Sequence, residues 1–377
     1  MDFDFTEEQQ AAVEAAKAVF AGVDPDAVPS PALTPGAVAD DFDRALWAKL
    51  AEADVLSLLL SDTYDGAGLD AIALCLVLRE SAKVLARVPL LESTAAAKTL
   101  ETYGSSEAKT RILPGVARGT TVLTVAANGR TGHDSAELAV TARPDGADWV
   151  LDGVQTGVPW AHTADYTVVP AHTADGRSVL ALVPRVQDGL TLAEQFSTSG
   201  ERFAELRLES VRIAAIDVID ADGAWESLHQ LLATGTCALA LGLGEGVLGM
   251  TSEYTSKREQ FGHPVATFQA VAMQAADRYI DLRAMEVTLW QAAWRISTGA
   301  GGALPAAGDI AVAKIWASEG VRRVVQTAQH LHGGFGADTD YSLHRYHAWA
   351  KQLELSLGPA AAHEEALGEL LATHTLA

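Results

Sequence analysis

Cysteine and basic residues are scarce in this chain of 377 residues. Only two cysteines occur, Cys75 and Cys237, both within apolar segments, so we expect buried free thiols and neither a disulfide framework nor a cysteine metal site. Lysine and arginine number 27 against 49 aspartates and glutamates, which gives a formal net charge of −22. This excess of negative charge argues against nucleic acid or an anionic membrane as a partner. Any bound anion must be held by a few local basic groups.

Several segments that would define other classes of protein are also missing. No apolar run reaches the ~18 residues of a membrane span without polar interruption, and the opening MDFDFTEEQQ has neither a basic nor an apolar region of a signal peptide. We therefore expect a cytoplasmic protein. There is no Walker A sequence, G-x-S-x-G elbow, H-E-x-x-H motif or G-x-G-x-x-G after a strand. A Rossmann cofactor site is not expected, and we predict no metal site.

The hydrophobic pattern divides the chain into three predicted domains of an α+β fold. Residues 1–118 read as helical, with Thr6 as a predicted N-cap of the first helix. Residues 119–218 contain short β-branched or alternating runs, such as TVLTVAA and WVLDGVQ, broken by Gly, Asp and Pro. They predict a small antiparallel sandwich or barrel. Residues 219–377 return to helical spacing and predict a four-helix bundle.

The helices of the predicted bundle have recognisable ends. We expect one over about 225–257, a second over about 265–297 and a third ending near His332. The last begins near Leu343, with a break near Gly358-Pro359 because proline interrupts a helix.

The segment KREQFGHPVATFQ, residues 257–269, joins the first two bundle helices. Its Arg258 has a rigid fork of donors that suits a phosphate or pyrophosphate. Phe261 and Phe268 could cover an aromatic or sugar group, and Gln269 could bind a base edge. The alternative is an arginine that satisfies helix-end carbonyls, with both phenylalanines in the core. Spacing alone leaves both readings open.

A second segment, QHLHGGFG at residues 329–336, follows the third predicted helix. Its glycines let a ligand approach the backbone and expose amide donors that suit phosphates. Glycine clusters also end helices in the ordinary way, and His-x-His is a weak metal signal without further ligands.

Together, R-x-x-F-G-x-P-(x)3-F-Q and H-G-G-x-G-(x)3-D-Y, in that order and in the C-terminal helical domain, resemble the acyl-CoA dehydrogenase family. The resemblance covers essentially the whole chain. It implies dimers or tetramers that hold FAD, extended across a subunit interface. The residues implied to contact the pyrophosphate and ADP half of a partner's flavin are Arg258, Gln260, Phe261, Gln269, His330, Gly333 and Gly334.

The implied reaction removes two hydrogens from Cα and Cβ of an acyl-CoA. In the family a glutamate takes the α proton, hydride passes to flavin N5, and electrons leave to an electron-transfer flavoprotein. Ungapped alignment places Leu357 at the glutamate position, and the alternative position used by some members is Leu232. Leucine cannot accept a proton.

Two further departures concern the flavin. The family's T-E-P-x-x-G-S-D stretch is replaced by TVAANGRTGHDS, which retains only Asp134 and Ser135, and His330 replaces a common glutamine. These losses, with an ADP site retained, resemble the non-catalytic subunit of heteromeric (α2β2) dehydrogenases that act on steroid side-chain CoA thioesters. Two alternatives stay open: a homo-oligomeric binding or assembly module, and a homomeric flavoenzyme with a relocated base such as Glu354.

Overall fold

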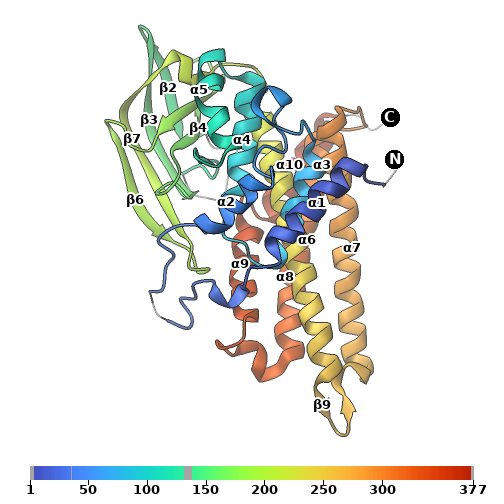
Figure 1. The fold of residues 1–377 in the computed structure, drawn as a ribbon. Coiled ribbons are helices and arrows are strands. Elements are labelled where there is room, and N and C mark those ends of the chain that lie inside the picture. The colour runs from blue at the N-terminus through green and yellow to red at the C-terminus, as the bar shows by residue number, and fades with distance from the viewer. Residues whose placement is uncertain (1–3, 35, 131–137, 375–377) are drawn as a thin grey trace.

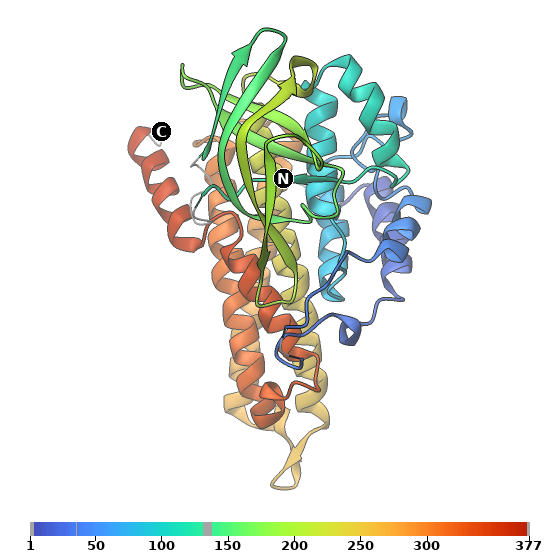
Figure 2. The ribbon, with the colours of Figure 1, turned by 90° about the vertical axis from the view of Figure 1, so that its left-hand side faces the viewer.

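The computed structural model describes residues 4–34, 36–130 and 138–374, which form a helical N-terminal part, a β-sheet and a long helical bundle (Figure 1). The sheet and the N-terminal helices lie beside one end of the bundle. The other end of the bundle projects beyond them and carries a small hairpin (Figure 2).

The N-terminal part consists of α1 (Glu7–Phe20), α2 (Arg44–Glu52), α3 (Ala71–Lys83), α4 (Leu90–Tyr103) and α5 (Ser106–Ala117). Helix α1 begins where predicted, because the Thr6 hydroxyl accepts a hydrogen bond from the Gln9 N–H while the Gln9 side chain accepts one from the Thr6 N–H. Helices α3 and α4 are apolar on most sides and are correspondingly buried.

The middle part is one sheet with the order β6-β7-β3-β2-β4-β5-β8, in which β1 also pairs with β4. Its strands are β1 (Leu123–Val125), β2 (Val140–Asp145), β3 (Asp148–Pro159), β4 (Tyr166–His172), β5 (Ser178–Pro184), β6 (Leu190–Phe196), β7 (Arg202–Ala214) and β8 (Val218–Ile219). Most described pairs are antiparallel, as predicted, but β1 and β2 each pair with β4 in parallel. The sheet is therefore mixed.

The C-terminal part consists of α6 (Ala224–Lys257), α7 (Gln269–Thr298), α8 (Ala306–His332), α9 (Leu343–Leu355) and α10 (Ala360–Thr373). The predicted break lies between α9 and α10, where Gly358 has a φ of 95° and Pro359 precedes the last helix. Helix α7 begins later than predicted because Val265–Thr267 forms a separate 3-10 turn.

Helix α6 is the central helix of the molecule. It contains a segment long and apolar enough to cross a membrane, contrary to the sequence prediction, but 78% of that segment is buried inside the protein. Close packing requires its glycines: a Cβ on Gly242 would lie 1.9 Å from the carbonyl oxygen of Arg79 on α3. We conclude that α6 is apolar because it is a core helix.

The two cysteines belong to this core. Both Cys75 on α3 and Cys237 on α6 are buried and unbonded, as predicted. Burial raises the pKa of the Cys237 thiol to about 12, so it stays protonated and unreactive.

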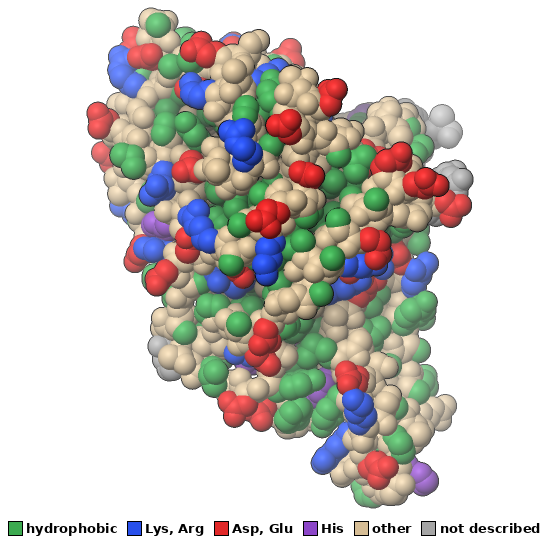
Figure 3. Space-filling view, in the orientation of Figure 1, with side chains coloured by type: hydrophobic (Ala, Val, Ile, Leu, Met, Phe, Trp, Pro, Cys, Tyr) green, Lys and Arg blue, Asp and Glu red, His purple; other side chains and the backbone are tan. Residues whose placement is uncertain are grey.

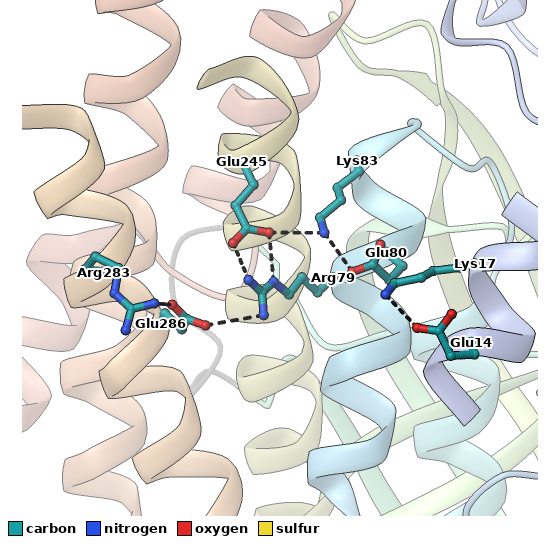
Figure 4. A network of polar contacts seen from close by, with 8 residues as sticks. All are labelled: Glu14, Lys17, Arg79, Glu80, Lys83, Glu245, Arg283 and Glu286. Atoms are coloured by element: carbon teal, nitrogen blue, oxygen red, sulfur yellow. Dashed lines mark hydrogen bonds and ion pairs between the residues drawn. The ribbon is translucent and has the colours of Figure 1, made fainter. Parts of the chain in front are cut away.

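Ion pairs join the N-terminal helices to the bundle. Figure 4 shows charged side chains of α3, α6 and α7 linked in one network, with the Glu14–Lys17 pair of α1 close by. At its centre the Arg79 guanidinium binds the carboxylates of Glu245 and Glu286, and Lys83 reaches Glu245. Arg79 is only 19% exposed, so its loss would leave two carboxylates without their buried partner. The network holds α3 against α6 and α7.

Candidate functional site

The arginine corner is a tight hairpin at the projecting end of the bundle. After α6 ends, β9 (Glu259–Gln260) pairs antiparallel with β10 (His263–Pro264). The two loop residues between them, Phe261 and Gly262, have φ angles of 55° and 80°, as a two-residue type I′ turn requires. Side chains of both charges gather at this tip (Figure 3).

A groove of about 690 Å³ lies at the base of the hairpin. It is lined by Tyr254, Arg258, Gln260, Val265, His330, Leu331, His332, Gly333, Gly334 and Phe335. The two segments singled out in the sequence therefore meet in space. Of the predicted cofactor contacts, five lie in this groove: Arg258, Gln260, His330, Gly333 and Gly334.

Aromatic packing supports the floor of the groove. The ring of His332 stacks on Tyr254 with centroids 4.3 Å apart, and Phe335 packs on both Tyr254 and Tyr341. The Nδ1 of His332 lies 2.8 Å from the Ala328 carbonyl, and burial lowers its pKa. His332 is thus a neutral packing residue. In the described part of the chain no group of three or more His, Cys, Asp or Glu is placed to hold a metal.

The groove offers unused donors to a ligand. Arg258 is exposed, and its guanidinium makes no hydrogen bond or ion pair with any residue that the structure describes. Gly333 has φ 62° and ψ −137°, a conformation that side chains disfavour, and nothing lies within 4 Å of a Cβ built on Gly333 or Gly334. An exposed guanidinium and an open glycine backbone in the lining of one groove fit a phosphate or pyrophosphate. The helix-capping alternative for Arg258 does not apply.

Two predicted contacts lie outside the groove lining. Phe261 at the hairpin tip is 92% exposed and meets Phe268 edge-on with ring centroids 6.3 Å apart. Gln269 is exposed at the start of α7. Neither phenylalanine belongs to the core. Both therefore remain available to a molecule that approaches the tip.

A separate cavity of about 110 Å³ lies between the N-terminal helices, the sheet and the bundle. Leu232 of α6 and Leu357, from the turn between α9 and α10, both line it. Their side chains are almost fully buried. The two positions that sequence reasoning identified thus lie in the wall of one cavity.

The turn that carries Leu357 is firmly held. Leu357 has φ 57°, a left-handed conformation that is uncommon for a leucine. The fully buried Lys314 ammonium donates to Ser318 Oγ at 2.9 Å and to the Gly358 carbonyl at 3.0 Å, and burial lowers the pKa of Lys314 to about 8. The His363 Nε2 lies 2.9 Å from the Leu357 carbonyl, and burial lowers the pKa of His363 to about 4. Because a carbonyl only accepts, this Nε2 carries the proton.

Sequence reasoning missed the two carboxyl groups that line the cavity, Glu92 and Glu201, of which Glu201 pairs with Arg87. Glu92, in the first turn of α4, lines it. Burial raises the pKa of Glu92 to about 7, while its own backbone N–H and the Trp160 side chain act in the opposite direction. The signal was a single acidic residue within the otherwise apolar and small-residue segment LLESTAAA, which is typical of a buried helix.

Known proteins share this arrangement. Residues 6–120 match the acyl-CoA dehydrogenase N-terminal domain, and residues 230–371 match the acyl-CoA dehydrogenase C-terminal domain. Acyl-CoA dehydrogenase FadE27 of Mycobacterium tuberculosis is 36% identical over 336 residues, which cover 88% of this chain and 89% of that protein. The chain belongs to the acyl-CoA dehydrogenase family.

Solved acyl-CoA dehydrogenases have the same fold along the whole chain. The ChsE4-ChsE5 complex from Mycobacterium tuberculosis matches with a TM-score of 0.91 and 34% identity over 100% of both chains. A variant of the Tcur3481-Tcur3483 steroid ACAD matches with a TM-score of 0.89 and 36% identity, over 97% of this chain and 98% of that one. FAD is the cofactor of relatives with this fold, and a glutaryl-CoA dehydrogenase from Mycobacterium smegmatis was solved with FADH2.

In this acyl-CoA dehydrogenase chain, the remaining predicted residues lie away from the cavity or outside the description. Glu354 of α9 accepts a hydrogen bond from the Lys351 ammonium at 2.6 Å and does not belong to the cavity lining. Asp134 and Ser135 lie outside the described residues.

Proposed function

We propose that this chain is the non-catalytic subunit of a heteromeric acyl-CoA dehydrogenase, in which it completes the FAD site of a catalytic partner. The observation that carries the proposal is a contrast in side chains. The guanidinium of Arg258 lies in an open groove with no partner among the described residues. In contrast, the two base positions inferred from the sequence are Leu232 and Leu357, which line the cavity. The chain can bind an anion and cannot remove a proton at those positions.

The groove residues fit the diphosphate of FAD. Arg258 would hold the pyrophosphate through its fork of donors, and the backbone at Gly333 and Gly334 would approach the same group. Bound FAD supplies the hydride acceptor of the reaction. The residues of this chain contribute binding and orientation, with Gln260 and His330 at the groove wall and Phe261 and Gln269 facing outward.

The spacing along α6 supports a cofactor shared with a partner. Arg258 and Leu232 are 26 residues apart on and just after one continuous helix, so about 39 Å of helix separates them at 1.5 Å per residue. This separation favours a flavin whose ring lies in another subunit over one that reacts in this chain's own cavity.

An exposed apolar stripe on α7 supports assembly with that partner. Met273, Ile280 and Val287 recur every seven residues and are 60%, 62% and 48% exposed. Large apolar side chains in a row are usually covered by another protein surface. We propose that a catalytic acyl-CoA dehydrogenase subunit covers the stripe in an α2β2 assembly.

The proposed substrate is a CoA thioester with a steroid side chain, because the chain matches a solved steroid ACAD at 36% identity over nearly its full length. Electrons would leave to an electron-transfer flavoprotein, and the assembly would work in the cytoplasm. The net charge of −22 supports the absence of nucleic acid or an anionic membrane from this set of partners.

The decisive experiment measures FAD per chain and native mass for the protein expressed alone and together with a catalytic acyl-CoA dehydrogenase encoded beside it. We expect FAD only in the mixed assembly, at one per two chains, and its loss in Arg258→Ala. Lys257→Ala is the matched control, because it also removes one exposed positive charge, at a side chain that pairs with Glu253 outside the groove lining. This control should retain FAD.

Two results would contradict the proposal. A lone chain that carries one FAD and reduces it with an acyl-CoA would identify a homomeric enzyme with a relocated base. A stable oligomer that never binds FAD, alone or mixed, would identify a binding or assembly module.

A further inference from the structure

Lys314 of α8 is a buried cation held without an ion pair. Its side chain is 0% exposed, and its ammonium makes no ion pair with any carboxylate of the described residues. A buried charge is costly unless polar groups surround it. The oxygen atoms around the ammonium must therefore stabilise it.

Four oxygen atoms surround this ammonium. The Ser318 Oγ lies 2.9 Å from the Nζ and the Gly358 carbonyl oxygen lies 3.0 Å from it. The carbonyl oxygens of Glu354 and Leu353 follow at 3.3 and 3.4 Å. The three carbonyls belong to the end of α9 and the turn after it, where helix carbonyls lack partners and the helix dipole is negative. An ammonium has three donors and no acceptor, so this cage uses all of them.

The turn that the cage holds separates two spaces. Leu357 lines the interior cavity, and it also lines an open space of about 580 Å³ between α10 and the N-terminal ends of α6 and α8, the α10 groove. Among the described lining residues, it is the one that the two spaces share. Its φ of 57° is unfavourable for a leucine, so contacts must hold the turn in place. The ammonium of Lys314 supplies one at the next residue, Gly358.

The loss of one proton would change this cage. A neutral amine has two donors and a lone pair, and in the same place the lone pair would face an oxygen atom. One buried carbonyl would then lose its donor, which is costly. Ser318 lies one turn from Lys314 on the same helix. The turn after α9 is therefore the side of the cage that can move away.

The proton on Lys314 is lost in mildly alkaline solution. Burial lowers the pKa of Lys314 to about 8, while Cys237 of α6 and Glu354 of α9 act in the opposite direction, and no described group of α7 contributes. Burial raises the pKa of Cys237 to about 12 and lowers that of His363 of α10 to about 4. The Glu354 carboxylate is paired with the Lys351 ammonium at 2.6 Å. Neither Cys237 nor His363 titrates near pH 8.

We propose that Lys314 is a proton-controlled clamp on the turn between α9 and α10. Its ammonium form holds Leu357 in place between the interior cavity and the α10 groove, and its amine form releases the turn. The clamp needs neither FAD nor a partner subunit, so it stands independently of the proposed function.

A titration of the full-length chain from pH 6.5 to pH 9.5 by NMR tests the proposal. The ¹³Cε shift of Lys314 reports its protonation, and the difference between the two methyl ¹³C shifts of Leu357 reports its side-chain rotamer. We expect both to change with the same midpoint, near pH 8. Leu232 is the control probe, because it lines the same cavity from α6. Its methyl shift difference should stay constant.

Two variants separate the clamp from other effects of pH. Lys314→Met should leave Leu357 in its released rotamer at every pH. Lys351→Met is the matched control, because it removes an exposed lysine from the end of α9, and Leu357 should titrate in it as in the wild type. Relative to Lys314→Met, the wild type should become more stable above pH 8, because the pKa of Lys314 is lower in the folded state than its ordinary 10.5. General unfolding therefore cannot account for the release of the turn.

The proposal is overturned if Leu357 keeps its rotamer while Lys314 loses its proton. It is also overturned if the titration of Leu357 persists in Lys314→Met, or if the methyl groups of Leu232 change with the same midpoint. The first criterion uses the wild type alone, so it decides the question even if Lys314→Met does not fold.

Discussion

The corner groove and the interior cavity are built from the same long helix and differ in almost every physical respect. The groove, at the C-terminal end of α6, is open and carries Arg258, whose guanidinium pairs with no side chain among the described residues. The cavity, beside the N-terminal half of α6, is lined mainly by apolar side chains, which include Leu232 and Leu357, the positions that the sequence predicts for the family base.

If the proposed function is right, this difference separates cofactor binding from proton transfer. The turn at Leu357 is held by Lys314 and His363 and keeps its left-handed backbone, although the side chain there has no acid–base function. Under the proposed function, the backbone of this turn is retained although leucine replaces the catalytic base. The groove is the opposite case, because the side chain proposed to bind the cofactor, Arg258, is present and exposed.

The largest expected contrast between the two regions is in stability. Leu232→Ala removes a buried side chain beside a cavity that cannot collapse fully, and should lower the free energy of unfolding by about 3 kcal/mol. Phe261→Ala removes a side chain that is 92% exposed and should change it by less than about 0.5 kcal/mol. Chemical denaturation of both variants measures the difference. Equal effects would mean that the hairpin tip is covered in the isolated chain.

The second contrast is in the response to pH. The pKa of Glu92 is raised to about 7 in the folded protein from an ordinary value of 4.5, so the folded state binds a proton more tightly than the unfolded state. Stability is greatest below the unfolded value and falls as pH rises through the folded value. Between pH 5.5 and pH 8 the wild type should lose about 2 kcal/mol that Glu92→Gln retains. The prediction is wrong if the free energy of unfolding changes equally in the wild type and in Glu92→Gln between the two pH values.

Much of the fold could be predicted from the sequence. The helical periods, the cap at Thr6 and the break at Pro359 follow from local chemistry and are confirmed. The parallel pairing of β1 and β2 with β4 is not readable from alternation, because a strand's side-chain period is the same in either direction. Family motifs placed Arg258 and the two leucines, but by spacing alone none of these assignments was decided.

Glu92 shows what local reasoning cannot reach. Its neighbours in sequence are apolar or small, and only the fold brings Leu232 and Leu357 to the same cavity from far along the chain. Burial, which shifts its pKa, is a property of the assembled core. A lone acidic residue in an apolar helix indicates a buried carboxyl group, but the sequence does not show which side chains surround it.

A smaller effect is expected from the glycine loop of the groove. Gly333→Ala places a Cβ on a backbone with φ 62° and ψ −137°, and should cost about 1 to 2 kcal/mol of stability and weaken FAD binding in the mixed assembly. Gly334→Ala is the matched control for the loss of stability only, because its φ is not positive and the space around it is open. If both variants unfold at the same denaturant concentration, the strained backbone of this loop is not rigidly held.

The smallest effect is expected at Glu354, which lines neither the groove nor the cavity. Its carboxylate pairs with the 45% exposed Lys351 one turn away on α9, so Glu354→Gln should change the free energy of unfolding by about 0.5 kcal/mol. Because the side chain is outside the cavity lining, flavin reduction by an acyl-CoA in the mixed assembly should also stay unchanged. Stopped-flow measurement of that reduction is the sharper readout. A large loss of rate with normal FAD content would place the proton-accepting group on this chain after all and would favour the relocated-base enzyme over the non-catalytic subunit.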